Sequence, residues 1–148
     1  MQVILIRHAH AEWPNYHGAD FERPLTERGL AEARASARAI SDAGHRPTLL
    51  LASPARRTRQ TAEILAEEFQ LSVSAVLFID SLYNAGAGAL ATELREAATA
   101  TGTTVLVAHN PGISNLVREV ANEPDAPPLK PAEWRATTLH ATRSATTP

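Results

Sequence analysis

The chain has 148 residues, of which 44% are hydrophobic and 20% are charged, a composition that is typical of a globular protein and excludes a disordered one. It contains no cysteine, which excludes disulfides, thiolate metal sites and a cysteine nucleophile. The formal net charge of −2 gives no overall attraction to nucleic acid or to an anionic membrane, so neither is expected as a partner.

Length and patterning predict one domain over residues 1–148, with a frayed tail at residues 144–148. The apolar run Val3–Ile6 is shorter than the core of a signal peptide, and no stretch approaches the roughly 20 apolar residues of a membrane span. We therefore expect a cytoplasmic protein. Charge is divided unevenly, with +3 over residues 1–60 and −5 over residues 61–148, which is compatible with an anion site built from the first third of the chain.

The first half of the chain predicts two strands that alternate with two helices. Val3–Ile6 is a continuous apolar run, typical of a strand that is buried on both faces. Apolar residues then repeat at helical spacing over residues 26–43, and Gly44 ends this helix. Residues 48–52 predict a second buried strand, and residues 55–69 a second helix.

The second half continues the alternation. In chain order we expect a strand over 73–79, a helix over 88–100, a strand over 103–108, a helix over 112–120 and an edge strand over 135–142. The stretch before the last strand, residues 123–131, carries four of the ten prolines and must be a loop. This pattern predicts an α/β domain whose mainly parallel sheet has helices on both faces. Ligands bind such folds beyond the carboxyl ends of the strands.

Polar residues of an unusual kind follow three of these strands. They are Arg7 and His8 after the first strand, Ser53, Arg56, Arg57 and Arg59 after the second, and His109 and Asn110 after the strand over 103–108. Because the carboxyl ends of parallel strands meet at one edge of a sheet, we expect two histidines and several arginines to converge there.

This set of side chains suits a phosphoryl group. Arginine offers a planar fork that matches two phosphate oxygens, and a helix N-terminus adds amides and a positive dipole end. Neutral imidazole is a nucleophile that can carry a phosphoryl group covalently. We expect Arg7 and Arg57 to disfavour protonation of His8, and a charged His109 to stabilise the equatorial oxygens in the transition state.

Plainer roles are expected for the other candidates. His17, His45 and His140 are expected at the surface or in the core, and Arg56 and Arg59 on a solvated helix face. Metal binding is the rival interpretation for His8, His10 and His109, but neighbouring arginines would repel a cation, so neither a metal nor an organic cofactor is expected.

Four motifs, in this order, resemble those of the histidine phosphatase superfamily. They are Arg7-His8-Ala9, similar to its Arg-His-Gly motif; Arg23-Pro24-Leu25-Thr26 followed by Gly29; Ser53 to Ala62; and Val107-Ala108-His109-Asn110. The resemblance covers about residues 2–120. The short chain, without an insertion between Ala62 and the second histidine, is similar to the SixA-like phosphohistidine phosphatase branch.

The resemblance implies a three-layer α/β/α sandwich of the phosphoglycerate mutase type. It also implies that His8 is the nucleophile, that Arg7 and Arg57 hold phosphate, and that His109 completes the pocket. Arg23 and Asn110 are further candidates for substrate binding.

Two departures from the family pattern affect the expected chemistry. Ala9 replaces the usual glycine and is expected to crowd the pocket floor slightly, a change that we interpret as benign. Asn84 lies about where mutase and acid-phosphatase relatives have a glutamic acid, and an amide cannot protonate an alkoxide. An imidazole leaving group has a conjugate acid with a pKa of about 6.5, so it can leave without a dedicated acid. Glu12, Asp20 or Asp80 are the alternative acids if a loop brings one in.

We therefore expect a monomeric phosphatase that works through a phospho-His8 intermediate, and a phosphohistidine-bearing protein as its substrate. A small phosphoester is the alternative substrate, which would make the protein a small-molecule phosphomonoesterase. A phosphate-binding regulatory module without turnover is the alternative of another class.

Overall fold

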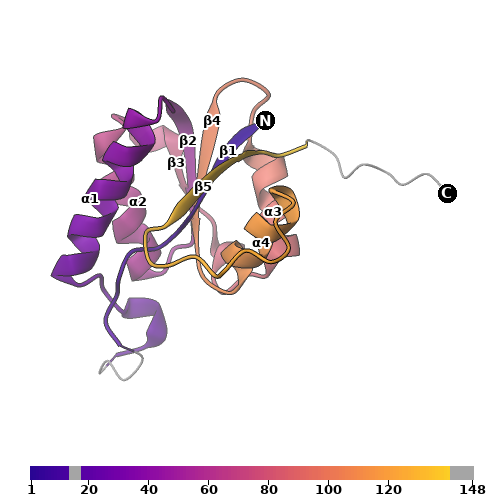
Figure 1. Ribbon diagram of the computed structural model, residues 1–148. Helices are drawn as coiled ribbons and strands as arrows, with labels where there is room; N and C mark the ends of the chain where they lie inside the picture. Colours follow the sequence, from indigo (N-terminus) through magenta and orange to yellow (C-terminus); the bar gives the residue numbers. More distant parts are fainter. Residues whose placement is uncertain (14–17, 141–148) are drawn as a thin grey trace.

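A five-stranded sheet forms the centre of this computed structural model, which describes residues 1–13 and 18–140 (Figure 1). The strands are β1 (Gln2–Arg7), β2 (Pro47–Ala52), β3 (Val76–Phe78), β4 (Thr103–Ala108) and β5 (Trp134–Thr138). Their order across the sheet is β3-β2-β4-β1-β5. The pairs β3–β2, β2–β4 and β4–β1 are parallel, whereas β5 runs antiparallel to β1 at the edge. This confirms the mainly parallel sheet.

Helices cover both faces of the sheet and complete the predicted three layers. Figure 1 shows α1 (Glu27–Asp42) and α2 (Arg56–Glu68) on one side, with α3 (Ala87–Ala97) and α4 (Gly112–Val120) on the other. Three short 3₁₀ helices lie in the connections: η1 (Asp20–Glu22), η2 (Val73–Ala75) and η3 (Asp80–Leu82). Across residues 1–13 and 18–140, no helix has the length and apolar character needed to cross a bilayer.

Successive residues of the strands supply two separate cores, because side chains on a strand alternate between its faces. Val3 and Leu5 pack with α3 and α4, whereas Ile4 and Ile6 pack with α1 and α2. All four side chains are at most 1% exposed, and burying a side chain of this size contributes about 1.5–3 kcal/mol. A strand buried on both sides explains why its sequence is a continuous apolar run rather than an alternating one.

Five of the predicted elements are shorter than expected, and two of them, α1 and α2, lose one residue at each end. The third strand covers only Val76–Phe78, because the residues before it form the 3₁₀ helix η2. Helix α3 ends at Ala97, where the backbone turns extended at Ala98 and leads towards β4. The last strand begins one residue early, at Trp134, and ends at Thr138. The end of the predicted strand, beyond residue 140, and the predicted frayed tail lie outside the described residues.

The strand register places the sequence motifs side by side. Arg7 of β1 lies opposite Ala108 of β4, so the next residues along each strand, His8 and His109, emerge together. On the other side of β4, Ala52 of β2 lies opposite Val107, which brings Ser53 to the same edge. The polar residues that follow three strands therefore meet at the carboxyl edge of the sheet, as expected.

Gly112, the first residue of α4, allows a close approach between α4 and the turn that follows η3. A Cβ atom at this position would lie 2.0 Å from the carbonyl oxygen of Ala85, so any side chain must push the two segments apart. Because Gly112 has no side chain, the turn containing Asn84 and Ala85 can lie close to the start of α4, just after the carboxyl end of β4.

Replacing this glycine by alanine should destabilise the protein by about 1–3 kcal/mol, because forced overpacking shifts the backbone. Gly88→Ala in α3 is the matched control, since a Cβ there meets no atom of the described residues within 4 Å. It should be neutral or stabilising by up to about 1 kcal/mol. Urea unfolding of both variants measures the difference, and equal stabilities would contradict the close approach.

Candidate active site

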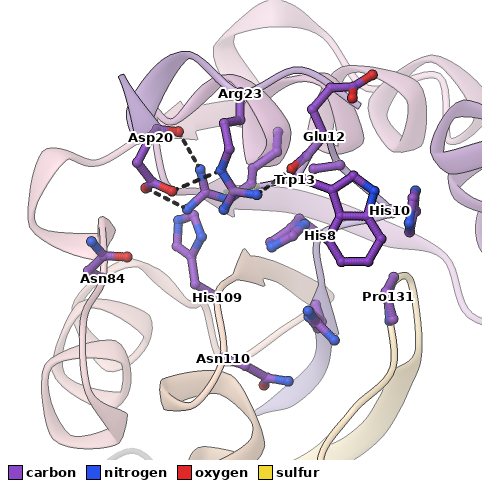
Figure 2. Close-up of a pocket in the computed structure, with 13 residues that line it drawn as sticks. His8, His10, Glu12, Trp13, Asp20, Arg23, Asn84, His109, Asn110 and Pro131 are labelled. Carbon is purple, nitrogen blue, oxygen red and sulfur yellow. Dashed lines mark hydrogen bonds and ion pairs between the residues drawn. The ribbon is translucent and has the colours of Figure 1, made fainter. Parts of the chain in front are cut away.

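A pocket of about 580 Å³ opens at the carboxyl edge of the sheet (Figure 2). All six residues that the sequence predicted for catalysis or substrate binding line it. The lining consists of Arg7, His8, His10, Ala11, Glu12, Trp13, Asp20, Arg23, Arg57, Asn84, His109, Asn110 and Pro131.

His8 is neutral near pH 7 and presents an unprotonated nitrogen. It is 8% exposed, and its Nδ1 lies 2.7 Å from the carbonyl oxygen of Ala9. Because a carbonyl oxygen only accepts, Nδ1 carries the proton and Nε2 keeps a free lone pair. Burial, opposed by the hydrogen bond to Ala9 and reinforced by the charge of Arg57, lowers the pKa of His8 to about 3. The sequence predicted this direction but attributed it to the arginines, whereas burial is the larger cause.

His109 lies next to His8, with 5.5 Å between the ring centroids. It is 4% exposed, and its Nε2 lies 2.8 Å from the Ser53 hydroxyl. Burial, followed by the charge of Arg57, lowers the pKa of His109 to about 4. His109 is therefore neutral in this structure, and its predicted charge, which applies to the transition state of phosphoryl transfer, stays a prediction. A buried imidazole among cationic groups stays neutral unless an anion is close enough to favour its charged form.

Ser53 has a role that the sequence motif did not reveal. It is fully buried at the end of β2, and its hydroxyl contacts His109 Nε2. This contact fixes the orientation of the His109 ring and leaves Nδ1 for another partner. The signal in the sequence was the position of Ser53 directly after a buried strand, where the sheet topology brings it to the β4 end.

Arg57 enters the site from the first turn of α2. It is 3% exposed, and it donates from Nη1 to the Asp20 carbonyl oxygen at 2.8 Å and from Nη2 to the Asp20 carboxylate at 3.1 Å. Arg7, at the end of β1, donates from Nη1 to the carbonyl oxygen of Leu129 at 3.1 Å. Burial and the charge of Arg57 lower the pKa of the Arg7 guanidinium, although arginine stays charged in proteins.

Three buried nitrogens in this pocket lack a hydrogen-bond partner within residues 1–13 and 18–140. They are Arg7 Nε, Arg57 Nε and His109 Nδ1. An unsatisfied buried polar group costs about 1–3 kcal/mol, so such groups call for a specific explanation. Two of the three belong to cations, and all three come from residues that the sequence singled out. Unpartnered buried nitrogens of this kind are suited to binding an oxyanion.

The second sequence motif packs the segment after His8 against α1. The Thr26 side chain caps α1 by accepting from the Gly29 amide at 3.1 Å, and it also lies 2.8 Å from His10 Nδ1. A Cβ at Gly29 would lie 2.0 Å from the His10 carbonyl oxygen, which explains the glycine. The motif therefore holds the His10–Glu12 wall of the pocket in place.

Arg23 and Asn110 reach the pocket, and each already makes two hydrogen bonds within the protein. Arg23 donates from Nη1 to the Glu12 carbonyl oxygen at 2.5 Å and from Nε to Asp20 at 2.9 Å. Asn110 donates to the Leu129 carbonyl oxygen at 2.9 Å and accepts from the Ser114 hydroxyl. Their contacts assign them to holding the pocket walls, and a direct contact with substrate stays a prediction.

Asp20 lies between two arginines, Arg23 and Arg57, a position that the sequence did not predict. Its carboxylate accepts hydrogen bonds from Arg23, Arg57 and the Tyr83 hydroxyl. Partial burial opposes ionisation, but these three partners outweigh it and lower the pKa of Asp20 to about 2. Asp20 is therefore held as a carboxylate at neutral pH in this structure, which disfavours it as the proton donor.

The other candidate acids differ in position. Asn84 lines the pocket in a left-handed backbone conformation with φ of 53°, which asparagine adopts more readily than most residues. Asp80 is exposed in η3 and is absent from the pocket lining found over the described residues. Glu12 does line the pocket. Of the alternative acids Glu12, Asp20 and Asp80, only Glu12 both lines the pocket and makes no ion pair with Arg57 among the described residues.

Ala9 and Arg59 differ in part from their predicted surroundings. The Ala9 side chain is fully buried in a small apolar cluster with Leu25 and Ala33 and does not crowd the pocket floor, which agrees with the interpretation of this replacement as benign. Arg59 is not simply solvated, because its guanidinium carbon lies 4.1 Å above the centre of the Phe78 ring, a cation–π contact. Arg56 is exposed, as expected.

The remaining histidines fit their plainer roles where they are described. His45 packs edge-on against Trp134, and His140 is exposed. His17 lies outside the described residues. Over the part of the chain that is described, no group of three or more His, Asp or Glu side chains is arranged to hold a metal ion.

Comparison with known proteins identifies relatives along most of the chain. Residues 3–80, just over half of it, match the family model of the histidine phosphatase superfamily (branch 1). The alignment with the structure of a SixA-type protein from Agrobacterium tumefaciens covers 91% of this chain and 88% of that protein's chain, with 32% sequence identity and a TM-score of 0.76. The alignment with the structure of the protein histidine phosphatase SixA in complex with tungstate covers 95% of this chain and 90% of that protein's chain, with 25% sequence identity and a TM-score of 0.80.

Curated relatives match over shorter stretches. An uncharacterized chloroplastic protein of Arabidopsis thaliana is 38% identical over 87 residues, which is 58% of this chain and 40% of that protein. A 2,3-bisphosphoglycerate-dependent phosphoglycerate mutase of Methylobacterium radiotolerans is 34% identical over 77 residues, which is 51% of this chain and 36% of the mutase. The chain thus matches less than half the length of these two relatives.

The structural likeness confirms the predicted phosphoglycerate mutase-like fold. Matched over more than half of its length by the family model and over at least 91% of it by the two SixA structures, the chain belongs to the histidine phosphatase superfamily and to its SixA-like branch.

Proposed function

We propose that this protein is a phosphatase that works through a phospho-His8 intermediate and removes phosphate from phosphohistidine in proteins. The observation that carries the proposal is the set of three unpartnered buried nitrogens beside a neutral histidine. Arg7, Arg57 and His109 supply these nitrogens, and His8 supplies a free lone pair. Family membership and the likeness to the protein histidine phosphatase SixA support the same assignment.

Two displacement steps account for turnover. In the first, the lone pair of His8 Nε2 forms a bond to phosphorus, while the bond from phosphorus to the leaving group breaks and its electron pair goes to the leaving atom. In the second, water attacks phosphorus and the bond to Nε2 breaks, which releases phosphate and restores neutral His8. Phosphoryl transfer depends mainly on positioning and on charge neutralisation, and Arg7 and Arg57 provide both.

The pocket wall on the side of Asn84 favours a leaving group that needs no acid. Asn84 occupies the rim with an amide, and Asp20 is held as a carboxylate. An alkoxide leaving group needs a proton in the transition state, whereas imidazole is a far weaker base and departs without one. This chemistry supports phosphohistidine as the substrate.

A small-molecule phosphomonoesterase is the second candidate, and the presence of Glu12 in the pocket lining favours it. A non-catalytic phosphate-binding module is disfavoured, because binding alone does not require an imidazole whose Nε2 is held unprotonated at neutral pH.

Incubation with a phosphorylated histidine-containing phosphotransfer domain and with a chromogenic phosphomonoester separates the three candidates. Faster release of phosphate from the phosphohistidine domain supports the proposal. Release from the monoester alone would identify a phosphomonoesterase, and release from neither would indicate a binding module.

Arg57→Ala should weaken the binding of phosphate or vanadate by about ten- to a hundredfold, because a charge-assisted hydrogen-bond pair contributes about 1.5–3 kcal/mol. Arg56→Ala is the matched control, since the neighbouring side chain is exposed and lies outside the pocket lining of the described structure. Titration calorimetry measures both affinities. Equal losses in the two variants would mean that a diffuse basic patch, rather than Arg57, binds the anion.

The rate should depend steeply on the basicity of the leaving group, since proton delivery to an alkoxide is typically worth about 10²–10⁴-fold and Asn84 cannot provide it. Asn84→Glu should therefore raise the rate on alkyl phosphates by about tenfold or more while changing the rate on phosphohistidine little. Asn84→Gln is the control, because glutamine has the same side-chain length as glutamate and the same cost of a positive φ, but it has no acidic group.

A series of phosphate esters with leaving groups of graded pKa measures this dependence. A flat series in the wild-type protein would show that another residue, with Glu12 as the first candidate, already protonates the leaving group.

A further inference from the structure

The Asp20 carboxylate keeps one acceptor position unused within the described structure. A carboxylate has about four lone-pair sites. Arg23 Nε takes one on Oδ1 at 2.9 Å, and Arg57 Nη2 at 3.1 Å and the Tyr83 hydroxyl take two on Oδ2. Over the described residues Oδ1 therefore accepts one hydrogen bond and can accept a second. The side chain is 48% exposed and lines the pocket, so a ligand can reach this oxygen.

The groups around Asp20 keep this oxygen negatively charged. Arg57 faces it from α2, Arg23 follows it after η1, and Tyr83 follows η3. Two of these neighbours are cations, and the third donates a hydrogen bond. A hydrogen-bond donor that enters the pocket can therefore donate to a negatively charged oxygen, Asp20 Oδ1. An N–H that belongs to a cation makes the strongest hydrogen bond to such an oxygen.

Asp20 lies on the side of the pocket from which the leaving group departs. In an in-line displacement the nucleophile and the leaving atom are on opposite sides of phosphorus. Figure 2 shows His8 on one side of His109, and Asp20 and Asn84 on the other. A phosphoryl group held beside His8 and His109 therefore directs its leaving group towards Asp20 and Asn84.

We propose that Asp20 is a specificity-determining residue that accepts the ring N–H of a leaving imidazole and so selects phosphorus–nitrogen substrates over phosphate esters. The inference rests on the proposed function and names the feature of the substrate that is recognised. When the phosphorylated ring is protonated on its far nitrogen, that N–H points away from phosphorus and donates to Asp20 Oδ1. As the phosphorus–nitrogen bond breaks, its electron pair goes to the near nitrogen, and neutral imidazole leaves with the proton still on the far nitrogen.

The same carboxylate disfavours esters. An alkyl or aryl phosphate presents no ring N–H, and its leaving oxygen gains negative charge close to Asp20. Like charges at short distance raise the energy of that transition state. Asp20 thus favours a leaving group that carries a ring N–H and departs as neutral imidazole, and it disfavours one that departs as an anion.

The test compares two small substrates, phosphoimidazole and p-nitrophenyl phosphate, in the wild-type protein and in Asp20→Asn. The variant keeps the shape of the side chain and can still accept from Arg57 and Tyr83, but it loses the charge. We expect kcat/KM for phosphoimidazole to fall by about tenfold or more, as for the loss of a hydrogen bond to a charged group. We expect kcat/KM for p-nitrophenyl phosphate to stay unchanged or to rise.

Glu22→Gln is the matched control, because Glu22 is an exposed acid of the same 3₁₀ helix and is not part of the pocket lining that the described residues define. It should leave both rates unchanged. The rate on p-nitrophenyl phosphate in each preparation reports a folded site, so a loss confined to phosphoimidazole cannot come from misfolding.

Each other outcome overturns the inference in a distinct way. An equal fall on both substrates would mean that Asp20 only orients Arg57. An equal rise would mean that Asp20 competes with phosphate for Arg57. If the wild-type protein hydrolyses p-nitrophenyl phosphate but not phosphoimidazole, the proposed function fails together with the inference. In the first two outcomes an active wild-type protein leaves the proposed function intact.

Discussion

The parallel pairing of β4 with both β1 and β2 is the constraint on which the site depends. It fixes Arg7 opposite Ala108 and Ala52 opposite Val107, so that the residues after each strand emerge together. These strands are held in register by side chains buried on both faces of the sheet. A shift by one residue would exchange the two cores, which makes the register costly to change. The position of His8 beside His109 therefore follows from packing far from the chemistry.

Burial then determines the charge state of the site. Both histidines are neutral because a cationic imidazole is poorly solvated there, and the nearby arginines reinforce the effect. The arginines themselves cannot lose their charge, so the pocket keeps a positive field that Asp20 balances only in part. A neutral imidazole held beside fixed cations is suited to phosphoryl transfer, which depends mainly on positioning and charge neutralisation. Charge in this pocket is thus a property of the fold as much as of the residue types.

The sequence predicted the elements and the principal site residues because both follow from local patterns. Apolar runs marked the buried strands, and polar residues directly after them marked the carboxyl edge of the sheet. The pairing of Ser53 with His109 and of Asp20 with Arg57 joins residues 56 and 37 positions apart, and no local pattern predicts such contacts. The neutral state of His109 in this structure could not be predicted for the same reason, because its degree of burial depends on the complete pocket.

The most direct test of the account is to trap the phosphorylated enzyme. Wild-type protein is mixed rapidly with p-nitrophenyl phosphate and denatured in alkali, in which a phosphorus–nitrogen bond survives, and the modified peptide is identified by mass spectrometry. Catalysis through His8 predicts one phosphoryl group on His8 in the wild-type protein. It also predicts that His8→Ala keeps its fold but shows neither this product nor turnover. A phosphoryl group on another residue, or a His8→Ala rate above about a tenth of the wild-type rate, would contradict it, since losing a nucleophile should cost far more.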